Sequence, residues 1–115
     1  MRYNAASRRR LKPPLEKSVQ HEIKRAAERL GFVVSDFSQP RASMQTPGIP
    51  DLYLTHPAKR FTCWVEVKRP GGKLSDHQRA WHSTASDAGN HVFTCDSVSG
   101  LIDALHDAGF PVSCS

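Results

Sequence analysis

Two acidic residues and a lysine stand where a β-sheet would bring them together. Asp51 opens one predicted strand, and Glu66 and Lys68 are two residues apart near the end of the next strand. Residues two apart on a strand point to the same face, and antiparallel pairing places Asp51 beside the end of the second strand. Two carboxylates in contact repel each other unless a proton or a cation separates them. The spacing therefore predicts a site for a hard divalent cation.

The same residues favour the hydrolysis of a phosphate ester. Mg²⁺ binds one or two carboxylates together with waters and phosphate oxygens, and the carbonyl of Val67 is a candidate third ligand. The ammonium group of Lys68 would orient the attacking water, help to deprotonate it, or stabilise negative charge on the phosphate. A Glu and a Lys that alternate on a solvated strand face are the ordinary alternative. Pro50-Asp51 on the preceding strand, and the apolar character of the strand that carries Glu66, argue against that alternative.

Other catalytic groups are not indicated. The three cysteines are widely spaced, and the six histidines are scattered along the chain. No Cys-x-x-Cys pair occurs, so a zinc site is not expected. We find no Ser-His-Asp arrangement and no setting for a reactive cysteine that would compete with the two acids and the lysine.

The helices and strands that position these residues are predicted from the spacing of apolar residues and from the residues that begin and end each element. Apolar residues recur at helical spacing after Pro13 and Pro14, and Gly31 ends that helix. Ser75 and Gln78 form a capping box at the start of a second helix. The predicted strands cover residues 32–37, 51–55, 61–68 and 91–95, the later helices cover residues 76–88 and 98–108, and residues 38–49 form a long loop.

This order, α-β-β-β-α-β-α, predicts an α/β fold with a mixed central sheet flanked by helices. The first three strands can form an antiparallel meander, and a right-handed crossover makes the fourth strand parallel to the third. Alternation along residues 61–68 turns Cys63 and Val65 to one face, and Trp64 and Glu66 to the other. Trp64 and Trp81 are expected in the core rather than as platforms for nucleic-acid bases.

Length and composition limit the classes to which the protein can belong. The 115 residues suffice for one domain, and 38% apolar with 23% charged residues fits a modest globular core. The longest apolar runs are short and no apolar stretch follows the basic N-terminus, so neither a membrane span nor a secretory signal is expected. The odd cysteine count fits reduced thiols, and we expect an intracellular, cytoplasmic protein. So small a core leaves little room for a deep pocket, which favours a large substrate in a surface cleft or a dimer that shares the cleft. No small-molecule cofactor is expected.

Charge is distributed unevenly. Lys and Arg total 16 against 11 Asp and Glu, and residues 1–12 hold five basic side chains and no acid. We expect residues 1–12 to be a flexible basic arm on a single domain over residues 13–115. A positive field of this kind suits nucleic acid, although a merely solubilising tail is an alternative. The candidate nucleic-acid contacts are Arg8, Arg9, Arg10, Arg41, Arg69 and Lys73.

The motifs resemble those of a known nuclease family. Pro50-Asp51, fourteen intervening residues and then Glu66-Val67-Lys68 are similar to the PD-(D/E)xK signature. Residues 48–52, 66–75 and 78–81 together resemble the VRR-NUC branch of that superfamily, over about residues 15–108. The resemblance implies a restriction-endonuclease-like α-β-β-β-α-β core.

Residue roles follow from the resemblance. Asp51 and Glu66 would bind Mg²⁺, or Mn²⁺ in its place, and Lys68 would serve the attacking water. The family adds a glutamate from the first helix, for which Glu16 is favoured and Glu22 is the alternative. Gln78 matches a glutamine near the active site, but it is also the expected capping residue, and we expect these two roles to compete.

The resemblance also implies a substrate. Small stand-alone members resemble homodimeric enzymes that cut branched DNA, notably four-way (Holliday) junctions, whereas larger members carry the module at the end of a flap nuclease. With nothing appended, this chain resembles the stand-alone type, in a bacterial or phage context. A twofold dimer would present two active sites to two strands. The alternatives are a flap-type or sequence-specific endonuclease, or a nucleic-acid-binding module without catalysis.

Overall fold

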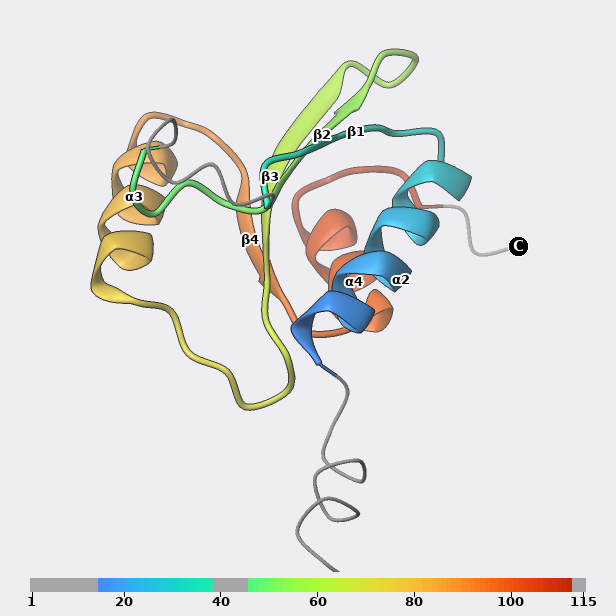
Figure 1. The fold of residues 1–115 in the computed structure, drawn as a ribbon. Helices are drawn as coiled ribbons and strands as arrows, with labels where there is room; N and C mark the ends of the chain where they lie inside the picture. The colour runs from blue at the N-terminus through green and yellow to red at the C-terminus, as the bar shows by residue number, and fades with distance from the viewer. Residues whose placement is uncertain (1–14, 39–45, 113–115) are drawn as a thin grey trace, which may run out of the picture.

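The computed structural model describes residues 15–38 and 46–112 (Figure 1). The predicted arm, the two prolines before the first helix, and Arg41 lie outside the described residues. The helices are α2 (Glu16–Arg29), α3 (Asp76–Asp87) and α4 (Val98–Asp107), and the strands are β1 (Val33–Asp36), β2 (Leu52–His56), β3 (Phe61–Val67) and β4 (Val92–Cys95).

The described strands form one mixed sheet in the order β1-β2-β3-β4. β1 and β2, and β2 and β3, pair antiparallel, whereas β3 and β4 pair parallel. α3 is the crossover between β3 and β4 and lies on one side of the sheet, while α2 and α4 lie together on the other (Figure 1). The predicted element order, strand pairing and α/β class are confirmed.

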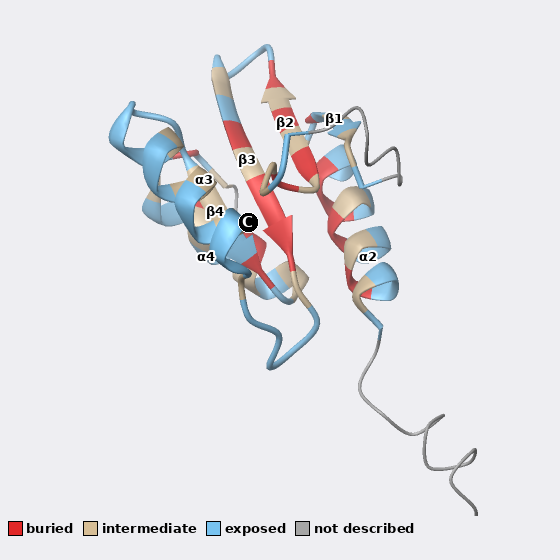
Figure 2. Ribbon diagram, turned by 60° about the vertical axis from the view of Figure 1, so that its left-hand side comes forward, coloured by how far each residue is buried: buried red, intermediate tan, exposed pale blue. Residues whose placement is uncertain are grey.

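The core lies between the sheet and the α2–α4 layer (Figure 2). Val65 and Val67 of β3 are fully buried, as are Ile23 of α2 and the two leucines of α4, Leu101 and Leu105. Side chains on this face of β3 alternate with those on the other, as the sequence predicted. Removal of these apolar surfaces from water is the main source of stability for the fold.

The layer on the other face of the sheet consists of α3 and is less buried than the α2–α4 layer. α3 has no buried residue, although Ser75 and Gln78 form the predicted capping box at its start. Trp64 and Trp81 are in contact, with ring centroids 5.0 Å apart, but both are only half-buried. The expectation that these tryptophans belong to the core was therefore wrong, because α3 covers its side of the sheet too loosely to enclose them. None of the described helices has the length and apolar character needed to cross a bilayer.

Candidate active site

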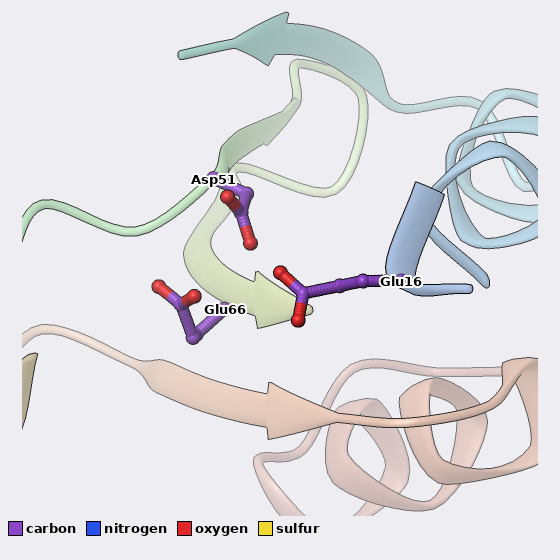
Figure 3. Close-up of side chains that lie close together, drawn as sticks. All are labelled: Glu16, Asp51 and Glu66. Carbon is purple, nitrogen blue, oxygen red and sulfur yellow. The ribbon is translucent and has the colours of Figure 1, made fainter. Parts of the chain in front are cut away.

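Three carboxylates meet at the end of β3 (Figure 3). Glu16 is the first residue of α2, Asp51 directly precedes β2, and Glu66 is the penultimate residue of β3. One carboxylate oxygen from each lies within 4.8 Å of the other two. The structure therefore brings Asp51 and Glu66 together as the sequence predicted, and adds the glutamate of the first helix.

Strand register and a tight loop place Asp51. Leu52 pairs with Val65, which brings Asp51 across from Glu66, and the backbone N–H of Val67 donates a 2.9 Å hydrogen bond to Asp51 Oδ2. The loop before Asp51 turns at Gly48, whose φ of +89° lies in the left-handed region. A Cβ atom there would lie 2.2 Å from the carbonyl oxygen of His77, so only glycine lets this loop reach the start of α3.

Glu66 is buried among groups that do not balance a negative charge on its carboxyl group. The residue is 1% exposed, and its Oε1 atom has no hydrogen-bond partner within residues 15–38 and 46–112. Oε2 accepts a 3.0 Å hydrogen bond from Gln78 Nε2, and Lys68 Nζ is 3.8 Å from the same oxygen. Burial, followed by the negative charge of Asp51, raises the pKa of Glu66 to about 8. A buried carboxylate with a free oxygen and two acidic neighbours is suited to a cation.

The donor set fits a hard divalent cation. Glu16, Asp51 and Glu66 offer only oxygen ligands, the kind that Mg²⁺ and Mn²⁺ prefer. Glu22, the alternative glutamate of the first helix, is exposed and lies outside this cluster. Val67 lies at the site through the N–H bonded to Asp51, and the use of its carbonyl as a ligand stays a prediction.

Gln78 fills both of the roles that we expected to compete. Its Oε1 atom accepts from the N–H of Ser75 at 2.8 Å, which completes the capping box, and its Nε2 atom donates to Glu66. The expectation of competition was wrong because the two ends of one amide serve the two contacts. The helix cap thus holds the amide against the buried carboxylate.

A basic hollow of about 470 Å³ lies beside the carboxylates. Gly72 donates to the carbonyl of Arg69 at 2.9 Å, so residues 69–72 form a turn at its edge. The predicted contacts Arg69 and Lys73 both line the hollow. Arg8, Arg9 and Arg10 lie outside the described residues. The lining consists of Leu15, Glu16, Lys17, Lys68, Arg69, Gly72 and Lys73.

Two residues of this region escaped the sequence reasoning. Lys17 lines the basic hollow, and its position directly after Glu16 was the available signal. His82 lies one helical turn after Gln78, and its buried Nε2 atom has no hydrogen-bond partner in the part of the chain that the structure describes. Burial, and then the positive charge of Lys68, lower the pKa of His82 and favour a neutral ring. The four-residue spacing from Gln78 was the signal for His82.

A mixed sheet that carries three carboxylates and a lysine at one end, beside a basic hollow, defines an α/β domain of nuclease type. The chain belongs to the VRR-NUC domain family, whose model matches residues 9–99. A solved structure described as a VRR_NUC domain is similar to it with a TM-score of 0.66 and 29% sequence identity, over 82% of this chain and 96% of that chain. The predicted family and fold are therefore confirmed.

Curated relatives carry a similar segment within much longer proteins. The chain is 44% identical over 48 residues to a Fanconi-associated nuclease 1 homolog of Caenorhabditis briggsae. The corresponding homolog of Caenorhabditis elegans is 42% identical over 48 residues. These matches cover 42% of this chain and only 6% of each relative. They support a nuclease at the level of the family.

Proposed function

We propose that this protein is a metal-dependent DNA endonuclease that hydrolyses phosphodiester bonds. The observation that carries the proposal is the convergence of Glu16, Asp51 and Glu66 within 4.8 Å of one another. A purely structural cluster of three acids would be destabilising, because their charges repel one another and nothing in the described chain pairs with Glu66 Oε1. A bound divalent cation removes that cost.

Each residue has a role that its contacts support. Glu16, Asp51 and Glu66 would hold Mg²⁺ or Mn²⁺, with the carbonyl of Val67 as a further ligand. The cation would lower the pKa of a bound water and offset charge on the phosphate. Lys68, whose Nζ atom is 3.8 Å from Glu66 Oε2, orients the attacking water and assists its deprotonation. Gln78 is a positioning residue, since it holds Glu66 through a hydrogen bond.

The basic hollow supports a nucleic-acid substrate. Lys17, Lys68, Arg69 and Lys73 line it, and Glu16 of the acidic cluster lines it as well. A phosphate group held there would lie next to the proposed metal ligands. Cationic side chains bind the phosphate backbone without regard to sequence, which fits an enzyme that selects the shape of its DNA. Arg8, Arg9, Arg10 and Arg41 are proposed as further contacts.

We propose branched DNA, such as a four-way junction, as the substrate and a homodimer as the active form. Support comes from membership of the VRR-NUC family. A twofold dimer would present two active sites to two strands of one junction.

A cleavage assay on matched substrates tests this function. The purified protein, with Mg²⁺ or Mn²⁺, is incubated with a four-way junction, a flap and a linear duplex that share one sequence. We expect the junction to be cut fastest, and light scattering to report a dimer. Lys68→Ala should slow cleavage by about 10²- to 10⁴-fold, whereas Lys59→Ala, on the exposed turn between β2 and β3, should leave the rate unchanged. Absence of cleavage on every substrate with either metal would refute the proposal.

A further inference from the structure

An open, apolar groove lies beside the acidic cluster, between α3 and the sheet. Its volume is about 560 Å³. Trp64 and Trp81 supply aromatic surface, and none of the described residues that line the groove is acidic. The lining residues are Pro47, Trp64, His77, Ala80, Trp81, Thr84, Ala85, Ala88 and Asn90.

The groove is continuous with the site through three elements. On β3, Trp64 lies two residues before Glu66 and on the same face of the strand. On α3, His77 and Trp81 line the groove, while Gln78 between them binds Glu66. In the loop before β2, Pro47 lines the groove four residues before Asp51. The end of the groove at Pro47 and His77 therefore lies towards the carboxylates, although none of the three lines it.

Size and charge favour a small planar ligand over a protein surface. Nine of the described residues line the groove, whereas a stable protein–protein interface takes about 20–30 residues from each side. The volume lies in the range of small-molecule pockets, about 300–1,000 Å³. Among the described residues, the lining combines aromatic rings with three polar side chains, His77, Thr84 and Asn90, and holds no negative charge that would repel a polyanion. A nucleobase attached to a phosphate backbone fits this description.

We propose that the groove binds one unstacked nucleobase of the DNA strand whose phosphate occupies the acidic site. This inference rests on the proposed function, since it is the nuclease substrate that brings a base next to the carboxylates. Bases stack on aromatic side chains without strong sequence preference. The groove would thus select DNA in which a base near the scissile phosphate is free to leave its helix, as at a branch point.

A fluorescence experiment tests the groove separately from catalysis. The probe is a DNA junction with 2-aminopurine at single positions next to the cleavage site or, if nothing is cleaved, around the branch point. Binding is measured with Ca²⁺ in place of Mg²⁺, so that the carboxylates hold a cation while cleavage is not supported. We expect quenching at one position, and loss of that quenching with Ala85→Leu, which fills the groove, and with Trp81→Ala. Ser86→Leu adds the same side chain to α3 outside the lining and should leave the quenching intact. Circular dichroism verifies that each variant is folded.

An abasic substitution gives the second readout. If a base is held in the groove, its removal at the quenched position should weaken binding by wild-type protein about 5- to 150-fold, and Trp81→Ala should show little further loss. Quenching without cleavage would support the groove and refute the proposed function. Quenching that is absent, or that Ala85→Leu leaves unchanged, would overturn the groove proposal. A shift of the dimer equilibrium by Ala85→Leu, with quenching unchanged, would assign the groove to a second copy and overturn it too.

Discussion

Asp36 and Glu66 both carry carboxylates close to α2. The groups around Asp36 neutralise its charge, whereas two of the groups around Glu66 are themselves acidic. Lys24 Nζ of α2 lies 2.8 Å from Asp36 Oδ2, and Gln20 of α2 and Ser38 donate further hydrogen bonds to this carboxylate. Burial alone would raise the pKa of Asp36, but the bonds from Lys24 and Ser38 outweigh it and lower that pKa. Glu66 has one hydrogen bond from Gln78, a lysine at 3.8 Å and two acidic neighbours.

The difference separates an acid that stabilises the fold from one that is available to a ligand. Asp36 ties β1 to α2 and has its charge neutralised within the chain. Glu66 is more deeply buried, yet one of its oxygens has no hydrogen-bond partner among the described residues. Buried polar groups are almost always paired, so an unpaired carboxylate oxygen at the meeting point of three acids indicates a functional site. The comparison predicts that these two carboxylates respond in opposite ways to mutation, metal and pH.

Cleavage should show the largest contrast. Asp51→Asn or Lys68→Ala should lower the rate constant for DNA cleavage by about 10²- to 10⁴-fold, because each removes a group that acts on the reacting atoms. Asp36→Asn should leave that rate constant within a few-fold of the wild-type value. Single-turnover assays with Mg²⁺ measure all three variants. If Asp36→Asn lowered the rate constant as much as Asp51→Asn, the distinction between Asp36 and the carboxylates of the candidate site would be refuted.

A divalent cation should stabilise the protein through the site that contains Glu66 and not through Asp36. A cation at 100 times its dissociation constant raises the free energy of unfolding by about 2.7 kcal/mol. We expect a rise of this order when Mn²⁺ replaces EDTA, and we expect it to vanish in Asp51→Asn and to persist in Asp36→Asn. Thermal denaturation under the two conditions measures the effect. Stabilisation that survives Asp51→Asn would place the cation elsewhere.

The two carboxylates should give opposite pH dependences of stability. In metal-free protein, Glu66 binds its proton up to about pH 8, whereas the unfolded chain releases it near the ordinary value of 4.5. Its contribution to stability is therefore complete below pH 4.5 and is lost as the pH rises through about 8. Asp36, whose pKa is lowered, contributes above its ordinary pKa of 3.8 and loses that contribution as the pH falls.

Glu66→Gln isolates the first of these contributions. The variant keeps the size of the side chain and removes the charge, so it should be more stable than the wild type by about 1–3 kcal/mol at pH 8 without metal. The difference between the two denaturation curves should shrink towards pH 5. A difference that is independent of pH would contradict the unbalanced charge assigned to Glu66.

The smallest expected effect is the loss of the Asp36 network. Asp36→Asn weakens the contact with Lys24, and both side chains are partly exposed to water. We expect a decrease of about 0.5–1.5 kcal/mol in the free energy of unfolding. Urea denaturation at pH 7 measures it, with Lys24→Ala as the companion variant. An increase in the free energy of unfolding of Asp36→Asn would show that the charge of Asp36 is not better neutralised than that of Glu66.

Local patterns were sufficient to predict the fold and most of the candidate site. Apolar and polar residues alternate along β3, and glycines mark the ends of helices, so these elements could be predicted from the sequence. The strand register is then sufficient to bring Asp51 to Glu66. The position of Glu16 required the tertiary packing of α2 against the sheet, which periodicity does not contain. The Lys24–Asp36 pair likewise depends on how α2 lies against β1.

The face under α3 shows where sequence reasoning stops. Trp64 and Trp81 are large and apolar, so composition alone assigns them to a core. Whether a helix encloses such residues depends on how closely it approaches the sheet, and α3 buries none of its own residues. The dual role of Gln78 also depends on three-dimensional geometry, because only the folded chain shows that one amide reaches both Ser75 and Glu66.

Anomalous diffraction from a crystal soaked in Mn²⁺ tests the central claim most directly. The proposed site predicts a manganese peak within bonding distance of carboxylate oxygens from Glu16, Asp51 and Glu66, and no peak at Asp36. A structure without manganese at these three residues, or with the ion bound elsewhere on the domain, would contradict the account.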